Sequence, residues 1–233
     1  MQLPYFFEPE IIETLKVFTL SEETSKHCAQ VLRMKKGEQL QLTNGKGLLV
    51  TATITLADRR HSEVSIDSIE KFAQAKRKVS LGASLLKNSS RFEWFLEKAT
   101  EIGISEIIPL ICKHTERQHF RLDRMQNILV SAMLQSRQVW LPVLKESSAF
   151  SEVVQRANET QKLIAHCYDT EKEMLNHLPL EDDILLLTGP EGDFSVEEVE
   201  AALAKGFLPV SLGDTRLRSE TANIVAAVML RNY

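Results

Sequence analysis

The sequence has 233 residues, with 28 Lys and Arg against 32 Asp and Glu, which gives a net charge of −4 at pH 7. Hydrophobic residues make up 43% of it, but no apolar run approaches the ~20 residues of a membrane-spanning helix, so a globular protein is expected. The three scattered Cys residues argue against a disulfide framework and a structural zinc site. Since no secretory signal is apparent at the N-terminus, we expect a cytoplasmic protein.

The charge is unevenly distributed along the chain. Residues 71–150 hold 13 Lys and Arg against 7 Asp and Glu, a net charge of +6, and the segments on either side are acidic. A basic middle segment in an acidic protein can be a contact surface for a polyanion, or it can be an ordinary solvated surface. Charge alone leaves both interpretations open.

The N-terminal third predicts a small β-domain. Apolar and polar residues alternate over residues 38–43, 48–56 and 63–67. The Asn44-Gly45 pair between the first two runs is a strong hairpin signal. Ser21 and the two Glu residues after it predict a helix that continues to Leu32. A Lys-rich polar run then marks a boundary, so we expect a β-barrel domain over residues 1–72 and a second domain over residues 73–233.

The hydrophobic pattern changes its period in the second domain. Short β-prone runs alternate there with segments whose apolar residues recur every three or four positions, as in amphipathic helices. The strands are expected at residues 79–85, 106–111, 163–167, 184–187 and 208–212. The helices are expected at residues 91–102, 122–140 and 195–205, and after residue 220. This alternation predicts an α/β fold with a parallel sheet.

Two glycine-containing loops follow the last two strands. Thr188-Gly189-Pro190-Glu191-Gly192 comes after one strand, and Leu212-Gly213 comes after the next. Glycine lets the main chain approach a ligand closely. We expect these two strands to be adjacent, and ligands of parallel sheets bind at the carboxyl ends of the strands. The sequence therefore predicts a small-molecule pocket between the two loops.

Several common catalytic motifs are absent from the sequence. It has no Gly-x-Gly-x-x-Gly fingerprint, Walker A loop, His-Glu-x-x-His motif or Gly-x-Ser-x-Gly elbow. Its six His residues form no ligand pattern, so we expect no metal site and no metal catalysis.

Several motifs resemble the RsmE family, SPOUT-class methyltransferases that methylate N3 of a uridine in 16S ribosomal RNA. Gly189-Pro190-Glu191-Gly192 and Leu212-Gly213-x-x-Arg216-Leu217-Arg218-x-Glu220-Thr221-Ala222 are similar to the two cofactor loops of that family. His27-x-x-x-Val31-Leu32-Arg33-Met34-Lys35-x-Gly37-Glu38 is similar to its N-terminal RNA-binding barrel. Glu97-Lys98-Ala99-Thr100-Glu101-Ile102-Gly103, and Gln135-Ser136 followed by Pro142, resemble further family motifs, so the similarity covers nearly the whole chain.

The sequence departs from the family pattern at a few positions. Asp193 replaces the usual second Gly of the first loop, and Asp214 stands where Pro is common. Arg137 lies where the family commonly has Gly, and Tyr5 lies near the usual position of an Arg. These departures concern loop geometry and RNA contacts more than the chemistry.

The resemblance implies a SPOUT-type parallel sheet with a C-terminal deep trefoil knot, preceded by a small PUA-like β-barrel domain that binds RNA. It also implies S-adenosylmethionine as the cofactor, a homodimer with sites at the shared interface, and the 16S rRNA of the small ribosomal subunit as the substrate. Two alternatives stay open: a non-catalytic RNA-binding or ribosome-assembly factor, and a SPOUT methyltransferase that acts on tRNA.

Roles for individual residues follow from the resemblance and from the chemistry of uracil. Arg218 would stabilise negative charge on a uracil oxygen, and Glu220 or Glu191 would accept the N3 proton or orient Arg218. Glu220 is equally explained as a helix N-terminal carboxylate, and Glu191 as a solvated turn residue. The residues expected to hold the cofactor are Leu187, Thr188, Gly189, Gly192, Leu212, Gly213, Leu217, Arg218, Thr221 and His166. Those expected to contact RNA are His27, Arg33, Lys35, Lys87, Arg91, Arg117 and Gln135.

Overall fold

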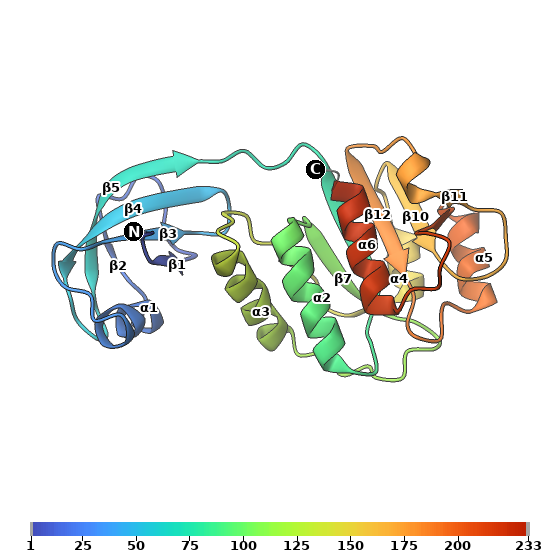
Figure 1. The fold of residues 1–233 in the computed structure, drawn as a ribbon, viewed down its shortest axis with the longest axis horizontal. Helices are drawn as coiled ribbons and strands as arrows, with labels where there is room; N and C mark the ends of the chain where they lie inside the picture. The colour runs from blue at the N-terminus through green and yellow to red at the C-terminus, as the bar shows by residue number, and fades with distance from the viewer. Residues whose placement is uncertain (1, 232–233) are drawn as a thin grey trace. The chain divides into compact units, whose positions relative to one another are not determined.

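A computed structural model describes residues 2–231 of the chain (Figure 1). The chain forms two compact units. The first contains the residues up to Gln74 together with Met133–Leu141, and the second contains Ala75–Ala132 and the residues from Pro142 onward. The first unit is therefore assembled from two separate stretches of sequence.

The first unit contains a five-stranded sheet with the strand order β1-β3-β4-β5-β2. Its strands are β1 (Tyr5–Phe7), β2 (Val17–Thr19), β3 (Gln39–Thr43), β4 (Leu48–Leu56) and β5 (Glu63–Lys71). β3 and β4 form the antiparallel hairpin that the Asn44-Gly45 pair predicts. Their inward side chains, among them Leu40, Val50 and Ile54, join one buried apolar cluster. Burying one face of the sheet fixes the strand register, because a slip by one residue would expose that face.

The predicted helix of the first unit begins as expected and then changes its winding. The hydroxyl of Ser21 accepts a hydrogen bond from the Thr24 N–H at the start of α1 (Glu22–Lys26). The chain continues as a π-helical turn, η1 (His27–Val31), in which the Leu32 N–H donates to the His27 carbonyl. Arg33 then takes a left-handed φ of 56° and ends the helical segment.

The second unit contains an eight-stranded sheet whose pairings are all parallel. The order is β11-β13-β10-β12-β6-β7-β8, and β9 also pairs with β7. Its strands are β6 (Lys78–Ser84), β7 (Glu106–Ile111), β8 (Val143–Leu144), β9 (Ser148–Ala149), β10 (Gln161–Ala165), β11 (Glu173–Met174), β12 (Asp183–Thr188) and β13 (Leu208–Ser211). The parallel α/β architecture predicted from the sequence is confirmed.

Helices separate or follow these strands along the chain. They are α2 (Ser89–Ile102), α3 (Leu122–Gln135), α4 (Phe150–Arg156), α5 (Val196–Ala204) and α6 (Ser219–Arg231), with a 3-10 turn, η2 (Leu175–His177). α6 lies beside α2 and packs on β6 and β12, as Figure 1 shows. α4 packs against α5 and β7. An apolar cluster that includes Phe150, Leu187 and Phe194 fills the space under α4 and α5.

Close approach of the strands makes glycine necessary at position 82. Gly82 lies on β6 opposite Leu187 of β12. A Cβ at this position would lie 2.4 Å from the Leu187 Cδ2, far inside van der Waals contact. The absent side chain therefore lets a leucine of the neighbouring strand fill the core.

The helix predicted for residues 122–140 ends at Gln135, five residues early. Arg137 adopts a left-handed φ of 56°, and the Gln138 N–H donates back to the Met133 carbonyl. The guanidinium of Arg137 donates to the Leu3 carbonyl at 2.6 Å and to the Gln41 side chain at 3.0 Å. These contacts hold a conformation that usually requires Gly, so the sequence carries no obvious stop signal.

The expectation that the strands preceding the two glycine loops are adjacent is wrong. β10 lies between β12 and β13 and pairs with both. The third predicted strand, residues 163–167, also ends earlier, at Ala165, which leaves His166 and Cys167 in the loop beyond it. Three loops, rather than two, therefore meet at this end of the sheet.

Candidate functional site

The loops after β10, β12 and β13 enclose two adjoining cavities. The larger has a volume of about 290 Å³, near the lower end of small-molecule sites, and the smaller about 60 Å³. Both are lined by Ala165, Cys167, Arg216, Leu217 and Ala222. The larger is completed by His166, Lys172, Val210, Ser211, Leu212, Gly213 and Thr215. The smaller is completed by Thr188, Gly189, Pro190, Glu191, Asp193 and Ser219.

Asp193 connects two of these loops. Its carboxylate accepts hydrogen bonds from the Cys167 N–H at 2.7 Å and from the Phe194 N–H at 2.8 Å. Its backbone has a φ of 63°, and its carbonyl lies 3.0 Å from the His114 Nδ1. Because hydrogen bonds to a carboxylate are stronger than those between neutral groups, Asp193 ties the loop after β10 to the loop after β12.

The loop after β10 is closed on itself by a lysine. The Lys172 ammonium donates to the carbonyls of His166, at 2.9 Å, and Tyr168, at 2.6 Å. The Tyr168 hydroxyl donates to the Phe194 carbonyl at 2.7 Å. These bonds give the cavity wall a defined shape without regular secondary structure.

His166 is the buried polar side chain of this wall, with 7% of its surface exposed. Burial lowers its pKa below 6.5, and the Lys172 ammonium acts in the same direction, against the opposing charge of Asp193. The imidazole is therefore neutral at pH 7. Both ring nitrogens are buried and have no hydrogen-bond partner among the described residues. A ligand in the larger cavity could satisfy one donor and one acceptor here.

Cys167 is the exposed thiol of the chain, whereas Cys28 and Cys112 are buried. Desolvation raises the pKa of Cys167, and the Asp193 carboxylate raises it further. The thiol is thus predominantly protonated at pH 7, and it contributes to the cavity wall as a neutral group.

A buried pair of polar side chains, Thr188 and Asn223, lies beside the smaller cavity. The hydroxyl of Thr188, the last residue of β12, is hydrogen-bonded to the Asn223 Oδ1 on α6. Asn223 is fully buried, and its Nδ2 has no partner among the described residues. The pair fixes the start of α6 against the end of β12, where the first glycine loop begins.

Most of the residues expected to hold a cofactor lie around these cavities. His166, Thr188, Gly189, Leu212, Gly213 and Leu217 line one or both of them. Leu187, Gly192, Thr221 and Arg218 do not: Leu187 belongs to the buried core, and Gly192 lies against the His114 side chain. Thr221 is exposed in the first turn of α6, and Arg218 is exposed just before that helix.

The three candidate catalytic residues have different surroundings. Glu191 lines the smaller cavity, is exposed, and accepts a hydrogen bond from the Lys87 N–H at 3.1 Å. Glu220 is buried, with its Oε1 3.6 Å from the Arg91 Nε and its Oε2 without a partner among the described residues. Arg218 is exposed near the cavities without lining them.

The candidate RNA contacts are divided between the two units. In the second unit, Lys87 pairs with Glu116 at 2.8 Å, Arg91 pairs with Glu220, and Arg117 is exposed. In the first unit, Arg33 and Lys35 follow the π-helical turn and are exposed. His27, also exposed, stacks edge-on against Phe6, and Gln135 is exposed at the end of α3.

Sequence reasoning missed four side chains that shape the cavities: Cys167, Lys172, Asp193 and Arg216. Arg216 lines both cavities. It belongs to the motif of the second glycine loop, so its position in that motif could have predicted it. Cys167 and Lys172 follow the strand now known to lie between the glycine loops. Their role depends on the strand order, which periodicity does not reveal.

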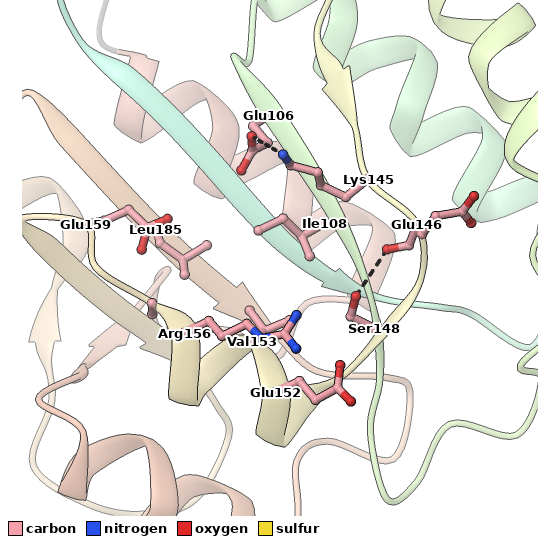
Figure 2. A pocket seen from close by; sticks show the side chains of 11 residues that line it. Glu106, Ile108, Lys145, Glu146, Ser148, Glu152, Val153, Arg156, Glu159 and Leu185 are labelled. Atoms are coloured by element: carbon pink, nitrogen blue, oxygen red, sulfur yellow. Dashed lines mark hydrogen bonds and ion pairs between the residues drawn. The ribbon is translucent and has the colours of Figure 1, made fainter.

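A second hollow of about 540 Å³ lies along β7 in the same unit (Figure 2). Its floor includes Ile108 and Leu185, and Lys145 pairs with Glu106 across its rim at 3.4 Å. Glu106 is the first residue of β7, so this hollow begins near the amino ends of the strands. None of the predicted site residues lines it.

None of the described helices combines the length and the apolar character needed to cross a membrane. Within residues 2–231, no group of three or more His, Cys, Asp or Glu side chains is arranged to hold a metal ion.

A parallel sheet whose loops enclose a cavity at the carboxyl ends of its strands defines an α/β protein of the small-molecule-binding class. Residues 73–231 match the family model described as an RNA methyltransferase domain, and residues 20–67 match an RNA methyltransferase PUA domain. The chain belongs to this RNA methyltransferase family. Its fold thus combines a PUA-like N-terminal domain with a SPOUT-like parallel sheet.

Individual relatives agree with this assignment. The chain is 30% identical to a ribosomal RNA small subunit methyltransferase E of Synechocystis, over 95% of this chain and 74% of the relative. A probable rRNA methyltransferase from Porphyromonas gingivalis is 36% identical, with a TM-score of 0.88 over 97% of this chain and 95% of its own. A Legionella pneumophila methyltransferase, solved with the bound cofactor SAM, is 30% identical, with a TM-score of 0.88 over 99% and 97%.

Proposed function

We propose that the protein methylates N3 of a uridine in 16S rRNA and takes the methyl group from S-adenosylmethionine. The observation that carries the proposal is the pair of cavities bounded by the two glycine loops. The names of the relatives support the substrate, since the Synechocystis protein is a ribosomal RNA small subunit methyltransferase. The bound SAM of the Legionella structure supports the cofactor.

The residues around the cavities fit this cofactor. A neutral His166 with unsatisfied ring nitrogens suits the hydroxyl and amine groups of a nucleoside. A Cβ at Gly213 would meet nothing within 4 Å, which leaves main chain directly exposed to a ligand. Arg216, which is exposed and lines both cavities, is available for a carboxylate. When bound, the cofactor supplies an activated methyl group.

The chain's remaining task is to align the acceptor base and to manage the N3 proton. Arg218 would stabilise the negative charge that spreads to the uracil oxygens as N3 loses its proton. Glu191, which lines the smaller cavity, would receive that proton. Glu220 would act indirectly and not by contact with the base, because its buried carboxylate pairs with Arg91.

Further parts of the proposal concern fold and assembly. The chain leaves β13, passes the ends of β10 and β12 and enters α6, which packs on β6; such a path supports a C-terminal trefoil knot. We also propose a cytoplasmic homodimer with an active site at the shared interface. Residues 1–72 would bind RNA and residues 73–233 would carry out the transfer, with His27, Arg33, Lys35 and Gln135 as RNA contacts in the first unit and Lys87, Arg91 and Arg117 in the second.

Mass spectrometry of rRNA and tRNA from a deletion strain tests this function. Loss of one 3-methyluridine from 16S rRNA, restored by the wild-type gene, is the expected result. Loss of a tRNA modification instead would identify a tRNA methyltransferase. Unchanged RNA together with no S-adenosylmethionine binding in calorimetry would identify a non-catalytic RNA-binding factor.

A further inference from the structure

The first unit contains a cleft of about 510 Å³ in which aromatic and basic side chains meet. It lies where the turn between β3 and β4, the end of β5 and the segment after α3 come together. Its lining residues are Ile12, Glu13, Asn44, Lys46, Gly47, Leu48, Lys71, Phe72, Ala73, Gln74 and Trp140. None of the RNA contacts expected from the sequence lines it.

Trp140 is held firmly in one wall of the cleft. A Cβ on Gly47 would lie 2.4 Å from the Trp140 Cζ2, so the indole packs directly on the glycine backbone. The Gly47 N–H donates to the Val139 carbonyl at 2.8 Å, and the Phe72 N–H donates to the Gly47 carbonyl at 2.8 Å. One glycine thus positions both aromatic residues of the cleft.

The side chains of the cleft are available to a ligand. Phe72 is 44% exposed, which is unusual for a phenylalanine. The Lys46 ammonium is exposed and has no ion-pair partner among the described residues. Lys71 pairs with Glu13, which neutralises the carboxylate of the cleft. The buried indole N–H of Trp140 has no acceptor among the described residues.

We propose that this cleft binds an unpaired nucleotide of RNA. Aromatic side chains beside lysines are the chemistry of single-strand recognition, because a base stacks on the ring while the ammonium contacts the phosphate. A paired base cannot stack in this way, so the cleft would select single-stranded RNA.

The cleft is separate from the basic residues identified from the sequence. The turn after Arg33 and Lys35 lies beside Ile54, whose carbonyl accepts the Gly37 N–H. The cleft lies at the other end of β4, beside Leu48. At ~3.3 Å per residue, the two sites are roughly 20 Å apart along the strand. The proposal rests on the proposed function only in taking RNA as the ligand.

Tryptophan fluorescence tests the proposal in the full-length protein. The chain has two tryptophans, so a Trp94→Phe background leaves Trp140 as the reporter. Titration with a short single-stranded RNA should quench Trp140 emission, and the same strand in a duplex should quench it much less. Phe72→Leu should weaken binding about 5-fold or more, since base–aromatic stacking contributes ~1–3 kcal/mol, and Phe72→Tyr should restore it.

A second test removes the charge of Lys46 and uses another exposed lysine, Lys16, as the control. Lys46→Gln should lower the slope of log affinity against log salt by ~0.7, the value for one phosphate contact to a single strand. Lys16→Gln removes an exposed lysine outside the cleft and should leave the slope unchanged. Equal quenching by duplex, or Phe72→Leu binding as tightly as the parent, would overturn the proposal. Methyl transfer to 16S rRNA measured on the same variants separates this failure from failure of the proposed function.

Discussion

The carboxylate of Asp193 accepts a hydrogen bond from the backbone N–H of Cys167 at 2.7 Å, although 26 residues separate them in sequence. The bond joins two of the three loops that enclose the candidate cofactor cavities. Asp193 also occupies a left-handed backbone position, which a glycine would adopt without strain. The two hydrogen bonds that its carboxylate accepts offset the cost of this backbone conformation.

Substitution of Asp193 separates these two effects. Asp193→Gly relieves the backbone but removes the acceptor, so we expect S-adenosylmethionine affinity to fall about 5- to 10-fold, as for one or two lost hydrogen bonds. Calorimetry measures the change. Asp169→Asn alters an exposed carboxylate of the neighbouring loop and serves as the control. Undiminished affinity in Asp193→Gly would show that the loops hold their arrangement without the bond.

Cysteine alkylation reports occupancy of the same cavity. Burial raises the pKa of Cys28 to about 11 and that of Cys112 to about 12, so iodoacetamide should modify only Cys167 in the native protein. S-adenosylmethionine should slow this reaction. Asp193→Asn should accelerate it, because loss of the carboxylate lowers the pKa of Cys167. Mass spectrometry counts the modified residues, and modification indifferent to the cofactor would place the ligand elsewhere.

His166 should make stability depend on pH. Its pKa in the folded protein is below 6.5, so the unfolded chain binds more protons between that lowered pKa and 6.5. The free energy of unfolding contributed by this residue therefore rises with pH across the window and is constant above it. Thermal unfolding of the wild type and of His166→Gln, compared from pH 5 to 8, measures the effect. If the stability of the wild type and that of His166→Gln changed with pH in the same way, a group other than His166 would account for the pH dependence.

Gly82→Ala should destabilise the protein by about 1–3 kcal/mol, because the new methyl group overlaps the Leu187 side chain in a packed core. Urea unfolding provides the measurement. Gly37→Ala is the comparison: its Cβ meets nothing within 4 Å, so only the cost of its φ of +94° is expected. Equal stability of Gly82→Ala and wild type would show that Leu187 can move aside.

The roles of the two glutamates are separable by kinetics. If Glu191 receives the N3 proton, Glu191→Gln should lower kcat about 100-fold while cofactor affinity changes little. Glu220→Gln should chiefly lower the melting temperature, because it weakens the pairing of this buried side chain with the partly exposed Arg91. The reverse pattern, with activity lost only in Glu220→Gln, would transfer the role of base to Glu220.

The sequence was most informative where one local rule determines the structure. The Asn44-Gly45 hairpin and the helix start at Ser21 are found as predicted, and the helix expected over residues 195–205 begins with a capping box at Ser195. Local rules failed where distant contacts hold an unusual backbone. Arg137 ends α3 in a left-handed conformation that its guanidinium contacts stabilise, and no glycine marks the position.

The candidate site was predictable only in part for a related reason. The glycine loops have a sequence pattern, and several of their residues line the cavities. The loop after β10 has no such sequence pattern. It joins the site only because β10 lies between β12 and β13, and this strand order depends on packing over the whole sheet. Arg218 is expected to contact the cofactor because it belongs to the motif of the second glycine loop, but it does not line the cavities.

The division of the first unit between two stretches of sequence has a consequence for biosynthesis. The turn at Gly45 and Gly47 hydrogen-bonds to Val139 and Leu141, which are translated more than 90 residues later. Domains that fold during translation usually do so in order from the N-terminus. Here the sheet of the first unit emerges from the ribosome early, but the wall containing Trp140 can be added only after α3 has been synthesised. A truncated chain that stops after β5 would therefore display an unfinished edge.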